Sequence, residues 1–386
     1  VKAFDSVDRV ALDAVLEKLG VPLKLRNVIM ALHSNVKIDI KLGDDKVSFS
    51  NKMGVVQGGS LSPTLFIIFV HAFVKTLDTS KWALPVYYTN DDDVLSGRSM
   101  FFKGGERFES PYSFYADDSG FGFCSRADFD IGAVVIRGHY ARWGLEMHVG
   151  TAKKESKTVA MFFPGCTRMY GDGDTSRLVF DDGSFVHFVT EFKYLGSYIH
   201  YSLRDDYDIE KRIETASKMF GALRGCIFSK ETVSYQAKRT AYVSIVLPTL
   251  LYGAETWAVS SGSLQKLQSF HNRCVRSMCH VNLWKTREFH LKTESLLDRL
   301  GMRSLDCYLH RRIIKWVGHV ARMPLDRLPR KFLTAWVRGP RGKHQPRLHY
   351  GSHITKCLKN IGVFDDWYTR AQDRDDWRAV VRGIKL

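Results

Sequence analysis

The sequence predicts an α+β protein in which a mixed unit of strands and helices precedes a mainly helical, basic half. Alternating, hairpin-like patterns dominate up to about residue 204, and apolar residues at helical spacing take over from about residue 205. A chain of 386 residues, 45% of them hydrophobic, can form two or three domains. We therefore assign residues 1–204 to the mixed unit, 205–300 to a helical region and 301–386 to a basic C-terminal region.

Local patterns define the first elements. Residues 10–19 predict a helix with Leu12, Leu16 and Leu19 on one apolar stripe, because their spacing follows the helical period. Residues 36–56 alternate and then turn like a β-hairpin. A second helix then begins with Ser62 as its N-cap and proline at its first position.

A second hairpin is predicted around the sequence SFYADDSGFGF, residues 113–123. The turn is expected at Asp117, Asp118 and Ser119, between strands of aromatic residues. Adjacent carboxylates repel, so a fold keeps them together only with a cation, a capping role or free solvent. At a hairpin tip they could hold Mg²⁺, which prefers oxygen ligands and bridges to phosphates. The alternative is that Asp, Ser and Gly are here simply good turn residues.

The remaining elements complete the α+β pattern. Residues 79–111 are irregular and polar, which indicates an inserted loop or an extended hairpin. A helix is expected over 127–143, and strands near 158–163 and over 192–199. Helical spacing then recurs along the second half, at 209–223, 236–258, 263–279 and 303–321.

The charge of the chain predicts a polyanionic partner. The formal net charge is +16 and the sequence pI is about 9.5, a balance most often associated with nucleic acid. Within residues 301–350 only Asp306 and Asp326 are acidic. A solvated basic face is the alternative explanation. The same fifty residues hold twelve cations: Arg303, Arg311, Arg312, Lys315, Arg322, Arg327, Arg330, Lys331, Arg338, Arg341, Lys343 and Arg347.

Two further features restrict the class of protein. The seven cysteines are scattered, and only Cys274 and Cys279 are close in sequence, so free or buried thiols are expected rather than a zinc knuckle. No run approaches the roughly 18 apolar residues of a membrane span, so we expect no membrane partner.

The order of several motifs resembles the palm of reverse transcriptases, specifically those of non-LTR (LINE-type) retrotransposons. The palm-like motifs are VKAFDSVDR at the start, GVVQGGSLSP at 54–63, FYADD at 114–118, GLEMHVGTAKKESKT at 144–158 and FKYLGS at 192–197. The later blocks look like the thumb and C-terminal region of such elements: VLPTLLYGAETW at 246–257, HNRCVRSMCH at 271–280, GHVARM at 318–323 and AQDRDDWRAVV at 371–381. The resemblance implies a right-hand polymerase palm, an antiparallel sheet with helices, followed by a helical thumb, with the fingers largely absent.

The resemblance also implies catalytic and nucleotide-binding residues. Asp117 and Asp118 match the catalytic pair that ligates Mg²⁺ (or Mn²⁺), and Phe4 matches the gate that rejects the ribonucleotide 2′-hydroxyl. Gln57 and Gly58 match the segment that packs against the incoming nucleotide and the template. The next two residues of this chain are Gly and Ser, where the family usually has Cys and Pro.

Two further sets of residues match family motifs. Lys157, with Lys154 as the alternative, lies in the segment whose lysine is proposed to protonate the leaving pyrophosphate. An exposed turn lysine is the other interpretation. The primer-grip motif corresponds to Phe192, Tyr194, Leu195 and Gly196, which could equally be strand residues that pack a core.

The implied activity is RNA-directed DNA synthesis, in which a two-metal site transfers a nucleotide from a dNTP to a primer 3′-OH. The implied partners are an RNA template, a DNA primer and dNTP, with no evident protein partner, in a ribonucleoprotein of the nucleus and cytoplasm. The family's first metal-binding aspartate would lie five residues before Phe4, upstream of Val1. We therefore expect a fragment without that aspartate, the fingers or an endonuclease, inactive or nearly so by itself. Asp5 is expected to cap or brace the helix that follows.

Two alternatives to a polymerase stay open at this stage. The chain could be a non-catalytic nucleic-acid-binding remnant or a domesticated retroelement protein. It could also be another palm-type phosphotransferase, such as a nucleotide cyclase, although the segment around Gln57 and the long basic half argue against that.

Overall fold

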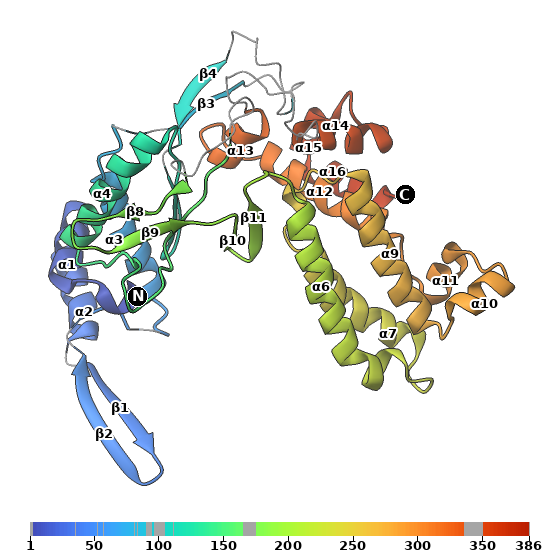
Figure 1. The fold of residues 1–386 in the computed structure, drawn as a ribbon, viewed down its shortest axis with the longest axis horizontal. Helices are drawn as coiled ribbons and strands as arrows, with labels where there is room; N and C mark the ends of the chain where they lie inside the picture. Colours follow the sequence, from blue (N-terminus) through green and yellow to red (C-terminus); the bar gives the residue numbers. More distant parts are fainter. Residues whose placement is uncertain are drawn as a thin grey trace. The chain divides into compact units, whose positions relative to one another are not determined.

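The chain forms two compact units, which are described separately (Figure 1). The first unit comprises Val1–Pro85, Glu109–Ala160 and Tyr170–Val189, and the second comprises Val86–Phe108, Met161–Met169 and Thr190–Leu386. Whether a palm domain extends to residue 204 stays a prediction. The computed structural model describes residues 3–34, 36–51, 53–56, 58–80, 82, 84–89, 95, 105–110, 112–164, 175–335 and 350–385.

Helices in the first unit share one small apolar core. Its buried side chains include Leu12 and Leu16 from the first helix and Phe66 and Phe69 from the third. Leu19, predicted on the same stripe, is 55% exposed because the helix ends before it. The helical elements are η1 (Ala3–Ser6), α1 (Arg9–Lys18), α2 (Leu23–His33), α3 (Ser62–Lys75) and α4 (Arg126–Arg142).

The predicted cap at Ser62 is wrong, and of the two roles expected for Asp5 the cap is wrong while the brace stays a prediction. The N-cap of α1 is Asp8, whose carboxylate accepts hydrogen bonds from the amides of Val10 (2.7 Å) and Ala11 (3.0 Å), so Asp5 does not cap this helix. The α3 helix begins at Ser62 itself, and the Ser62 hydroxyl donates to the carbonyl of Val56 instead of capping. Both errors are small shifts along the chain, which local patterns do not resolve.

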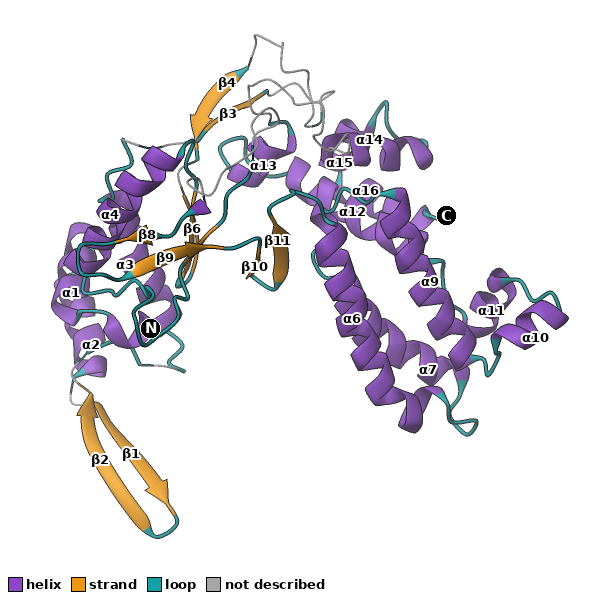
Figure 2. Ribbon diagram, viewed as in Figure 1, coloured by secondary structure: helices purple, strands orange, loops and turns teal. Residues whose placement is uncertain are grey.

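Strands of the described residues form several small sheets (Figure 2). Each hairpin is antiparallel, and only β7 pairs with β9 in parallel among the described residues, so the small sheets are compatible with the implied palm, whose arrangement stays a prediction. The sheets are β1 (Val36–Leu42) with β2 (Asp45–Asn51), β3 (Pro85–Tyr88) with β4 (Glu106–Glu109), β5 (Tyr112–Tyr115) with β6 (Asp118–Phe121), β7 (Val159–Ala160) and β8 (Leu178–Val179) on either side of β9 (Phe185–Phe188), and β10 (Glu191–Tyr194) with β11 (Ser197–His200).

The second unit is mainly helical, as the spacing predicts, and it encloses one large core. Tyr242, Trp257 and Ile313 are among its buried members. The helices are α6 (Asp206–Leu223), α7 (Tyr235–Ala241), α8 (Leu247–Leu250), α9 (Ser261–Met278), α10 (Leu283–Glu288), α11 (Thr293–Leu300), α12 (Leu305–Ala321), α13 (Leu328–Leu333), α14 (Tyr350–Asn360), α15 (Trp367–Gln372) and α16 (Arg374–Gly383). Single turns η2 (Arg224–Phe228), η3 (Tyr242–Val246) and η4 (Ala254–Thr256) connect several of them.

Two of the sequence motifs without an assigned chemistry pack against each other in this core. A Cβ atom on Gly318 of α12 would lie 1.9 Å from Nε1 of Trp377 on α16. The indole N–H donates to the carbonyl of Ile314 at 2.9 Å, and Arg322 donates to the carbonyl of Ala371 at 2.6 Å. The motifs GHVARM and AQDRDDWRAVV therefore have a structural role, which is to bring α12 and α16 into close contact.

Replacement of Gly318 by alanine should destabilise the second unit by about 2–4 kcal/mol, because the new methyl group displaces the Trp377 indole and breaks its hydrogen bond. Gly221 provides a matched control, since it lies in α6 and a Cβ atom there would meet no other atom within 4 Å. Gly221→Ala should stabilise by about 0.5–1 kcal/mol through helix propensity alone. Urea unfolding measures both, and equal effects of the two substitutions would contradict this packing role.

Candidate functional site

The two predicted site carboxylates lie at the end of the β5–β6 hairpin. Tyr115 pairs with Asp118, so the two-residue turn consists of Ala116 and Asp117. The hairpin is as predicted, but the turn begins one residue earlier than expected, and Asp118 is the first residue of β6. Ala116 has φ +52°, a conformation that costs an alanine about 1–2 kcal/mol. Its surroundings must therefore fix the turn.

Both carboxylates are exposed and available for a ligand. Neither the Asp117 nor the Asp118 carboxylate forms a hydrogen bond or ion pair within the described part of the chain. Behind them, the hydroxyls of Ser119 and Tyr140 share a hydrogen bond of 2.9 Å. Burial raises the pKa of Tyr140, and the negative charge of Asp117 acts in the same direction. Two adjacent charges without a counter-charge are a poor structural feature but a good pair of oxygen ligands.

Aromatic packing fixes this hairpin against two helices. The ring of Phe114 lies 6.0 Å from that of Phe73 on α3, centroid to centroid, in an edge-on arrangement. Phe73 is 1% exposed and also contacts His139 and Trp143, at the C-terminal end of α4. The hairpin tip is therefore held in a fixed position relative to α3 and α4.

Helix α3 also packs against Phe4, the residue predicted to reject the ribonucleotide 2′-hydroxyl. Phe4 stacks on Phe66 of α3, with ring centroids 4.3 Å apart and an interplanar angle of 16°. Phe66 precedes Phe73 by seven residues, which corresponds to about 10 Å along a helix. Phe4 and the carboxylate hairpin thus pack against the same side of α3, about two helical turns apart.

The loop that precedes α3 is bound to the first motif. The Gly54 amide donates to the Val7 carbonyl at 2.8 Å, and the Val55 amide donates to the Phe4 carbonyl at 2.9 Å. Gly54 has φ +79°, and a Cβ atom there would lie 2.6 Å from the Asp5 Cα atom, so only glycine fits. The Arg9 guanidinium binds the carbonyls of residues 51, 53 and 54.

Of the three other predicted site residues in this unit, the structure describes Gly58 and Lys157. Gln57 lies outside the described residues. Gly58 follows it with φ +84° and open space around its Cα. Lys157 is exposed, and its amide donates to Nδ1 of His148 at 3.1 Å. No hydrogen bond or ion pair joins the Lys157 ammonium to Asp117 or Asp118 in the described chain, and its role stays a prediction.

The predicted primer-grip residues form a hairpin, not the single strand expected over 192–199. Leu195 (φ +47°) and Gly196 (φ +88°) make a two-residue turn between β10 and β11. Phe192 and Leu195 are 37% and 40% exposed. Tyr194 lies on β10, and its buried hydroxyl has no hydrogen-bond partner in the described structure.

Two other side chains of the second unit bind the backbone of this turn. The Tyr252 hydroxyl donates to the Leu195 carbonyl at 2.9 Å, and the Arg212 guanidinium donates to the carbonyl of Gly196. Arg212 also lies 4.4 Å from the Tyr252 ring centroid, in a cation–π contact. The exposed apolar side chains of the turn are thus presented on a rigid support.

Three aspartates at the start of α6 were missed by sequence reasoning. Asp208 is 3% exposed and accepts hydrogen bonds from the amide of Tyr198 (2.9 Å) and the indole of Trp257 (3.0 Å), and Arg212 lies 3.5 Å away. It therefore ties β11 to α6 and to the segment before α9. The available signal was the acidic run RDDYD at a helix start, where negative charge is favoured.

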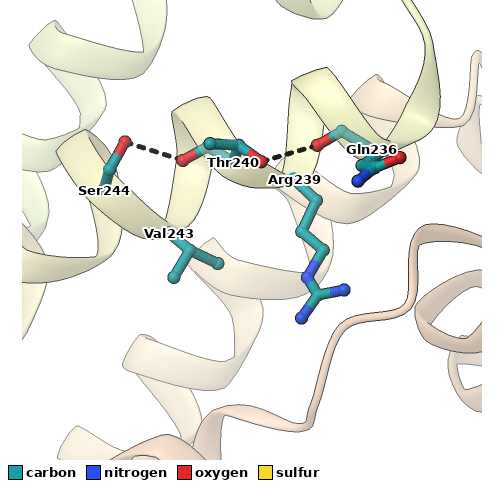
Figure 3. Close-up of a pocket in the computed structure, with 5 residues that line it drawn as sticks. All are labelled: Gln236, Arg239, Thr240, Val243 and Ser244. Atoms are coloured by element: carbon teal, nitrogen blue, oxygen red, sulfur yellow. Dashed lines mark hydrogen bonds between the residues drawn. The ribbon is translucent and has the colours of Figure 1, made fainter.

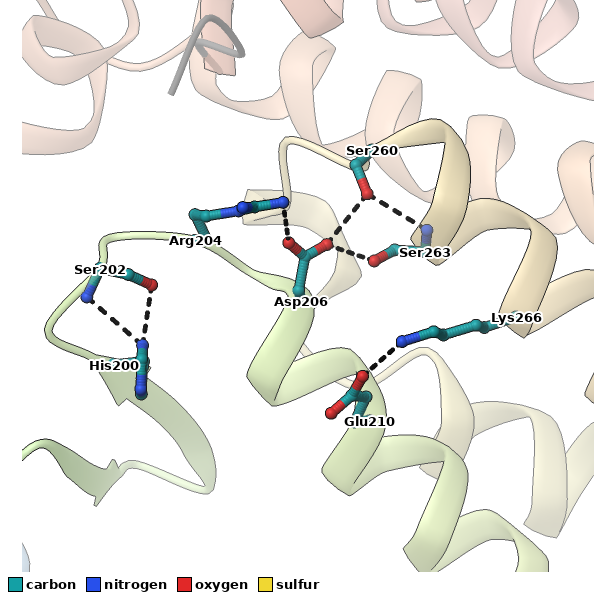
Figure 4. A network of polar contacts seen from close by, with 8 residues as sticks. All are labelled: His200, Ser202, Arg204, Asp206, Glu210, Ser260, Ser263 and Lys266. Atoms are coloured by element: carbon teal, nitrogen blue, oxygen red, sulfur yellow. Dashed lines mark hydrogen bonds and ion pairs between the residues drawn. The ribbon is translucent and has the colours of Figure 1, made fainter. Parts of the chain in front are cut away.

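Asp206 forms a set of polar contacts of its own (Figure 4). Asp206 accepts hydrogen bonds from the hydroxyls of Ser260 (2.9 Å) and Ser263 and pairs with Arg204 at 2.6 Å. Burial would raise the pKa of Asp206, but these bonds outweigh it, and the pKa is lowered. Asp205 accepts a hydrogen bond from the Ala258 amide, at 2.7 Å, and burial raises its pKa to about 6.

One surface pocket of the second unit has no carboxylate in its described lining. This pocket, of about 380 Å³ on α7 and η3, is lined by Gln236, Arg239, Thr240, Val243 and Ser244 (Figure 3). The hydroxyls of Thr240 and Ser244 donate to the carbonyls of Gln236 and Thr240, at 2.9 and 2.7 Å. Arg239 is the charged residue of its lining. This pocket offers no acid or nucleophile suited to catalysis.

Several cations of residues 301–350 turn out to be structural. Arg312 pairs with Glu255 at 2.9 Å, Arg303 donates to the Ile384 carbonyl at 3.1 Å, and Arg330 is 2% exposed. Arg322 binds the Ala371 carbonyl, as described above. Arg338, Arg341, Lys343 and Arg347 lie outside the described residues. The number of positive residues in this stretch therefore overestimates the positive charge that is available to a ligand.

The cysteines and other potential metal ligands of the described residues do not gather into a metal site. Cys274 and Cys279 are buried free thiols, and burial raises the pKa of Cys274 to about 12. No group of three or more His, Cys, Asp or Glu side chains in the described ranges is arranged to hold a metal ion. Among the same residues, no helix is long and apolar enough to cross a membrane.

Comparison with known proteins identifies the class. Residues 1–199 match the family described as reverse transcriptase (RNA-dependent DNA polymerase), and since this is more than half of the 386 residues, the chain belongs to that family. Its members are RNA-directed DNA polymerases. The chain is also 26% identical over 246 residues to F52C9.6, a transposon-derived protein of Caenorhabditis elegans, an alignment that covers 62% of this chain and 83% of the relative.

The raised pKa of Asp205 makes a pH-dependent prediction. Because the folded carboxyl, with a pKa of about 6, holds its proton more tightly than the unfolded one at 3.8, stability should fall as the pH rises between these values. Asp205→Asn should therefore stabilise by about 1–2 kcal/mol near neutral pH and flatten that pH dependence. Asp206→Asn is the control and should destabilise the fold, because the lowered pKa of Asp206 means that its negative charge stabilises the folded state. Chemical unfolding across the acidic to neutral range measures both, and destabilisation by Asp205→Asn at neutral pH would contradict this explanation.

Proposed function

We propose that this chain is part of a non-LTR (LINE-type) retrotransposon polymerase that transfers a nucleotide from a dNTP to a primer 3′-OH with release of pyrophosphate. The observation that carries the proposal is the pair of unpartnered carboxylates, Asp117 and Asp118, on a hairpin that Phe73 holds rigidly. They lie within the part of the chain that matches the reverse transcriptase family. Phosphoryl transfer depends mostly on positioning and charge, which a fixed tip with two carboxylates can provide.

The donor set fits a hard divalent cation. Mg²⁺ is usually bound through one or two carboxylates together with water and substrate phosphates, which agrees with two free carboxylates and no all-protein cage in the described residues. Asp117 and Asp118 would hold Mg²⁺ or Mn²⁺, which when bound stabilises the charge on the attacking and leaving oxygens. The chain's own contribution is a fixed, exposed pair of ligands and the stacked Phe4 beside α3.

Further roles follow from the resemblance. Phe4 would exclude the ribonucleotide 2′-hydroxyl, and Gln57 and Gly58 would contact the nucleotide and template. Lys157 would protonate the leaving pyrophosphate. The β10–β11 turn would grip the primer, since its exposed Phe192 and Leu195 are backed by Tyr252 and Arg212.

The proposal extends to domains, partners and location. Residues 1–204 would form the palm, 205–300 the thumb and 301–386 a basic C-terminal region. The partners would be an RNA template, a DNA primer and dNTP, within a ribonucleoprotein of the nucleus and cytoplasm. The net charge of +16 favours such polyanionic partners.

The carboxylate pair can be tested with a control that the chain itself supplies. Asp44 and Asp45 occupy the tip of the β1–β2 hairpin, where Leu42 pairs with Asp45 just as Tyr115 pairs with Asp118. With bound primer–template and dNTP, Mn²⁺ binding followed by electron paramagnetic resonance should be lost in Asp117→Asn/Asp118→Asn and retained in Asp44→Asn/Asp45→Asn. Equal losses in both variants would show nonspecific attraction to exposed carboxylates and would overturn the site.

Primer extension provides a second test of the two carboxylates. In a chain extended at its N-terminus by a reverse transcriptase first-motif segment, Asp117→Asn or Asp118→Asn should reduce primer extension on an RNA template by at least about a thousandfold, because the metal ligands are removed. Primer–template affinity should change by less than about threefold. Extension by the double variant at the parental rate would contradict the catalytic role.

Nucleic-acid binding by the whole chain should depend steeply on salt. Phosphate contacts release counterions, so affinity for a labelled RNA–DNA hybrid should fall by at least about a hundredfold between roughly 50 and 200 mM salt. Fluorescence anisotropy measures this directly. An affinity that barely changes would mean that the positive charge is only a solvated face.

A further inference from the structure

The α10 segment, residues 282–292, exposes two large aromatic side chains. Trp284 and Phe289 are 62% and 63% exposed, whereas the core residues Trp257 and Trp377 are 2% exposed. The rings of Trp284 and Phe289 meet edge to face, with centroids 6.4 Å apart and planes at 85°. A contiguous pair of exposed aromatic side chains, unlike a single exposed apolar residue, marks a candidate binding surface.

This segment is rigid despite its short helix. Asn282 caps α10 by accepting a hydrogen bond from the Lys285 amide at 2.7 Å. At the other end His290, with φ +45°, closes the helix through bonds from the amides of His290 and Leu291 to the carbonyls of Arg287 (3.4 Å) and Thr286 (3.0 Å). The two rings are therefore held at both ends of one capped turn.

The next helix anchors the segment to the core. α11 follows directly and buries Leu296, Leu297 and Leu300, which are 2%, 7% and 3% exposed. Pre-organised side chains lose little conformational entropy on binding, so such a surface can bind ligand without first being ordered.

Three cations lie between and just after the two rings along the chain. Lys285, Arg287 and Lys292 lie in this segment, and in the described part of the chain none of their side chains forms a hydrogen bond or ion pair. Glu288 is the one acid between residues 283 and 292. Arg312 and Arg322, in contrast, are bound to a carboxylate and a carbonyl. This segment thus keeps its positive charge available for a ligand.

We propose that residues 282–292 are a binding platform for single-stranded nucleic acid. Trp284 and Phe289 stack on bases, while Lys285, Arg287 and Lys292 contact the flanking phosphates. The perpendicular rings offer their faces in different directions, so two bound bases must be unstacked from each other, which a duplex resists. A protein partner would use the apolar area but would leave three cations without matching charge. The platform lies in the second unit and does not depend on the catalytic role of Asp117 and Asp118.

Stacking is tested by replacing the rings with aliphatic side chains in the whole chain. Binding of a fluorescein-labelled oligouridylate of about 20 nucleotides should weaken at least about tenfold in Trp284→Leu/Phe289→Leu, because apolar area without a π face stacks poorly. Trp284→Phe keeps a ring and should stay within about threefold of the parent. Leu325→Ala, at a side chain that is 51% exposed outside the platform, is the control and should change nothing. Binding of an RNA duplex of the same length should change less than about threefold in every variant.

The charges give an independent readout. Lys285→Gln/Arg287→Gln/Lys292→Gln should reduce the slope of log affinity against log salt by about 2 for the single strand, since three phosphate contacts are lost. Unchanged melting curves would show that each variant is folded, as expected for side chains outside the core.

Three results would overturn the platform. The first is oligouridylate binding by the leucine double variant within about twofold of the parent. The second is an equal loss of single-strand and duplex binding. The third is a change confined to self-association in sedimentation equilibrium, which would assign the rings to a contact between copies of the chain. Loss of Mn²⁺ binding at Asp117 and Asp118 is a separate outcome and bears only on the proposed polymerase site.

Discussion

The candidate site depends on the buried ring of Phe73. This residue of α3 contacts Phe114 behind the carboxylate hairpin and His139, Tyr140 and Trp143 at the end of α4. The His139 Nε2 atom lies 2.8 Å from the Phe73 carbonyl, and burial lowers the pKa of His139, so a neutral imidazole joins the two helices. Without this contact the hairpin would be a marginal two-stranded element. Because of it, two repelling carboxylates can stay exposed at a fixed position.

A comparison within the chain shows why packing, rather than the dipeptide, defines the site. The β1–β2 hairpin carries the pair Asp44–Asp45 in the same register as Asp117–Asp118. Its apolar side chains have no support, since Ile40, Val47 and Leu42 are 55%, 64% and 82% exposed. One Asp-Asp pair is therefore attached to a core and the other to an unsupported ribbon. A sequence pattern of two acids before a strand cannot distinguish these cases.

Elements that are determined by neighbouring residues could be predicted from the sequence. Turns and contacts that depend on residues far along the chain could not. The hairpin at Asp117 and the helices α1, α3 and α4 follow from turn residues and from apolar spacing. The β10–β11 turn was missed because Leu195 gives no local signal for positive φ, and the turn is supported by Arg212, 16 residues from Gly196, and by Tyr252, 57 residues from Leu195. The roles of the α6 aspartates were hidden for the same reason. Their partners, such as Trp257, lie about fifty residues further along the chain.

Some positive side chains of this chain stabilise the fold, and others remain available to a ligand. A count of positive residues along the chain favours residues 301–350, yet Arg303, Arg312 and Arg322 bind carbonyls or a carboxylate of the fold. The shorter segment at 282–292 holds few positive residues, but within the described part of the chain Lys285, Arg287 and Lys292 have no ion-pair partner, and the aromatic rings of Trp284 and Phe289 are exposed. Since a guanidinium already bound to the protein gains less from a phosphate than a free one, the distribution of partners matters more than the number of positive residues. In this chain neighbouring exposed aromatic side chains are the better indicator of a binding surface. Burial in the core is favourable for aromatic rings, and contiguous exposed apolar side chains mark interaction sites.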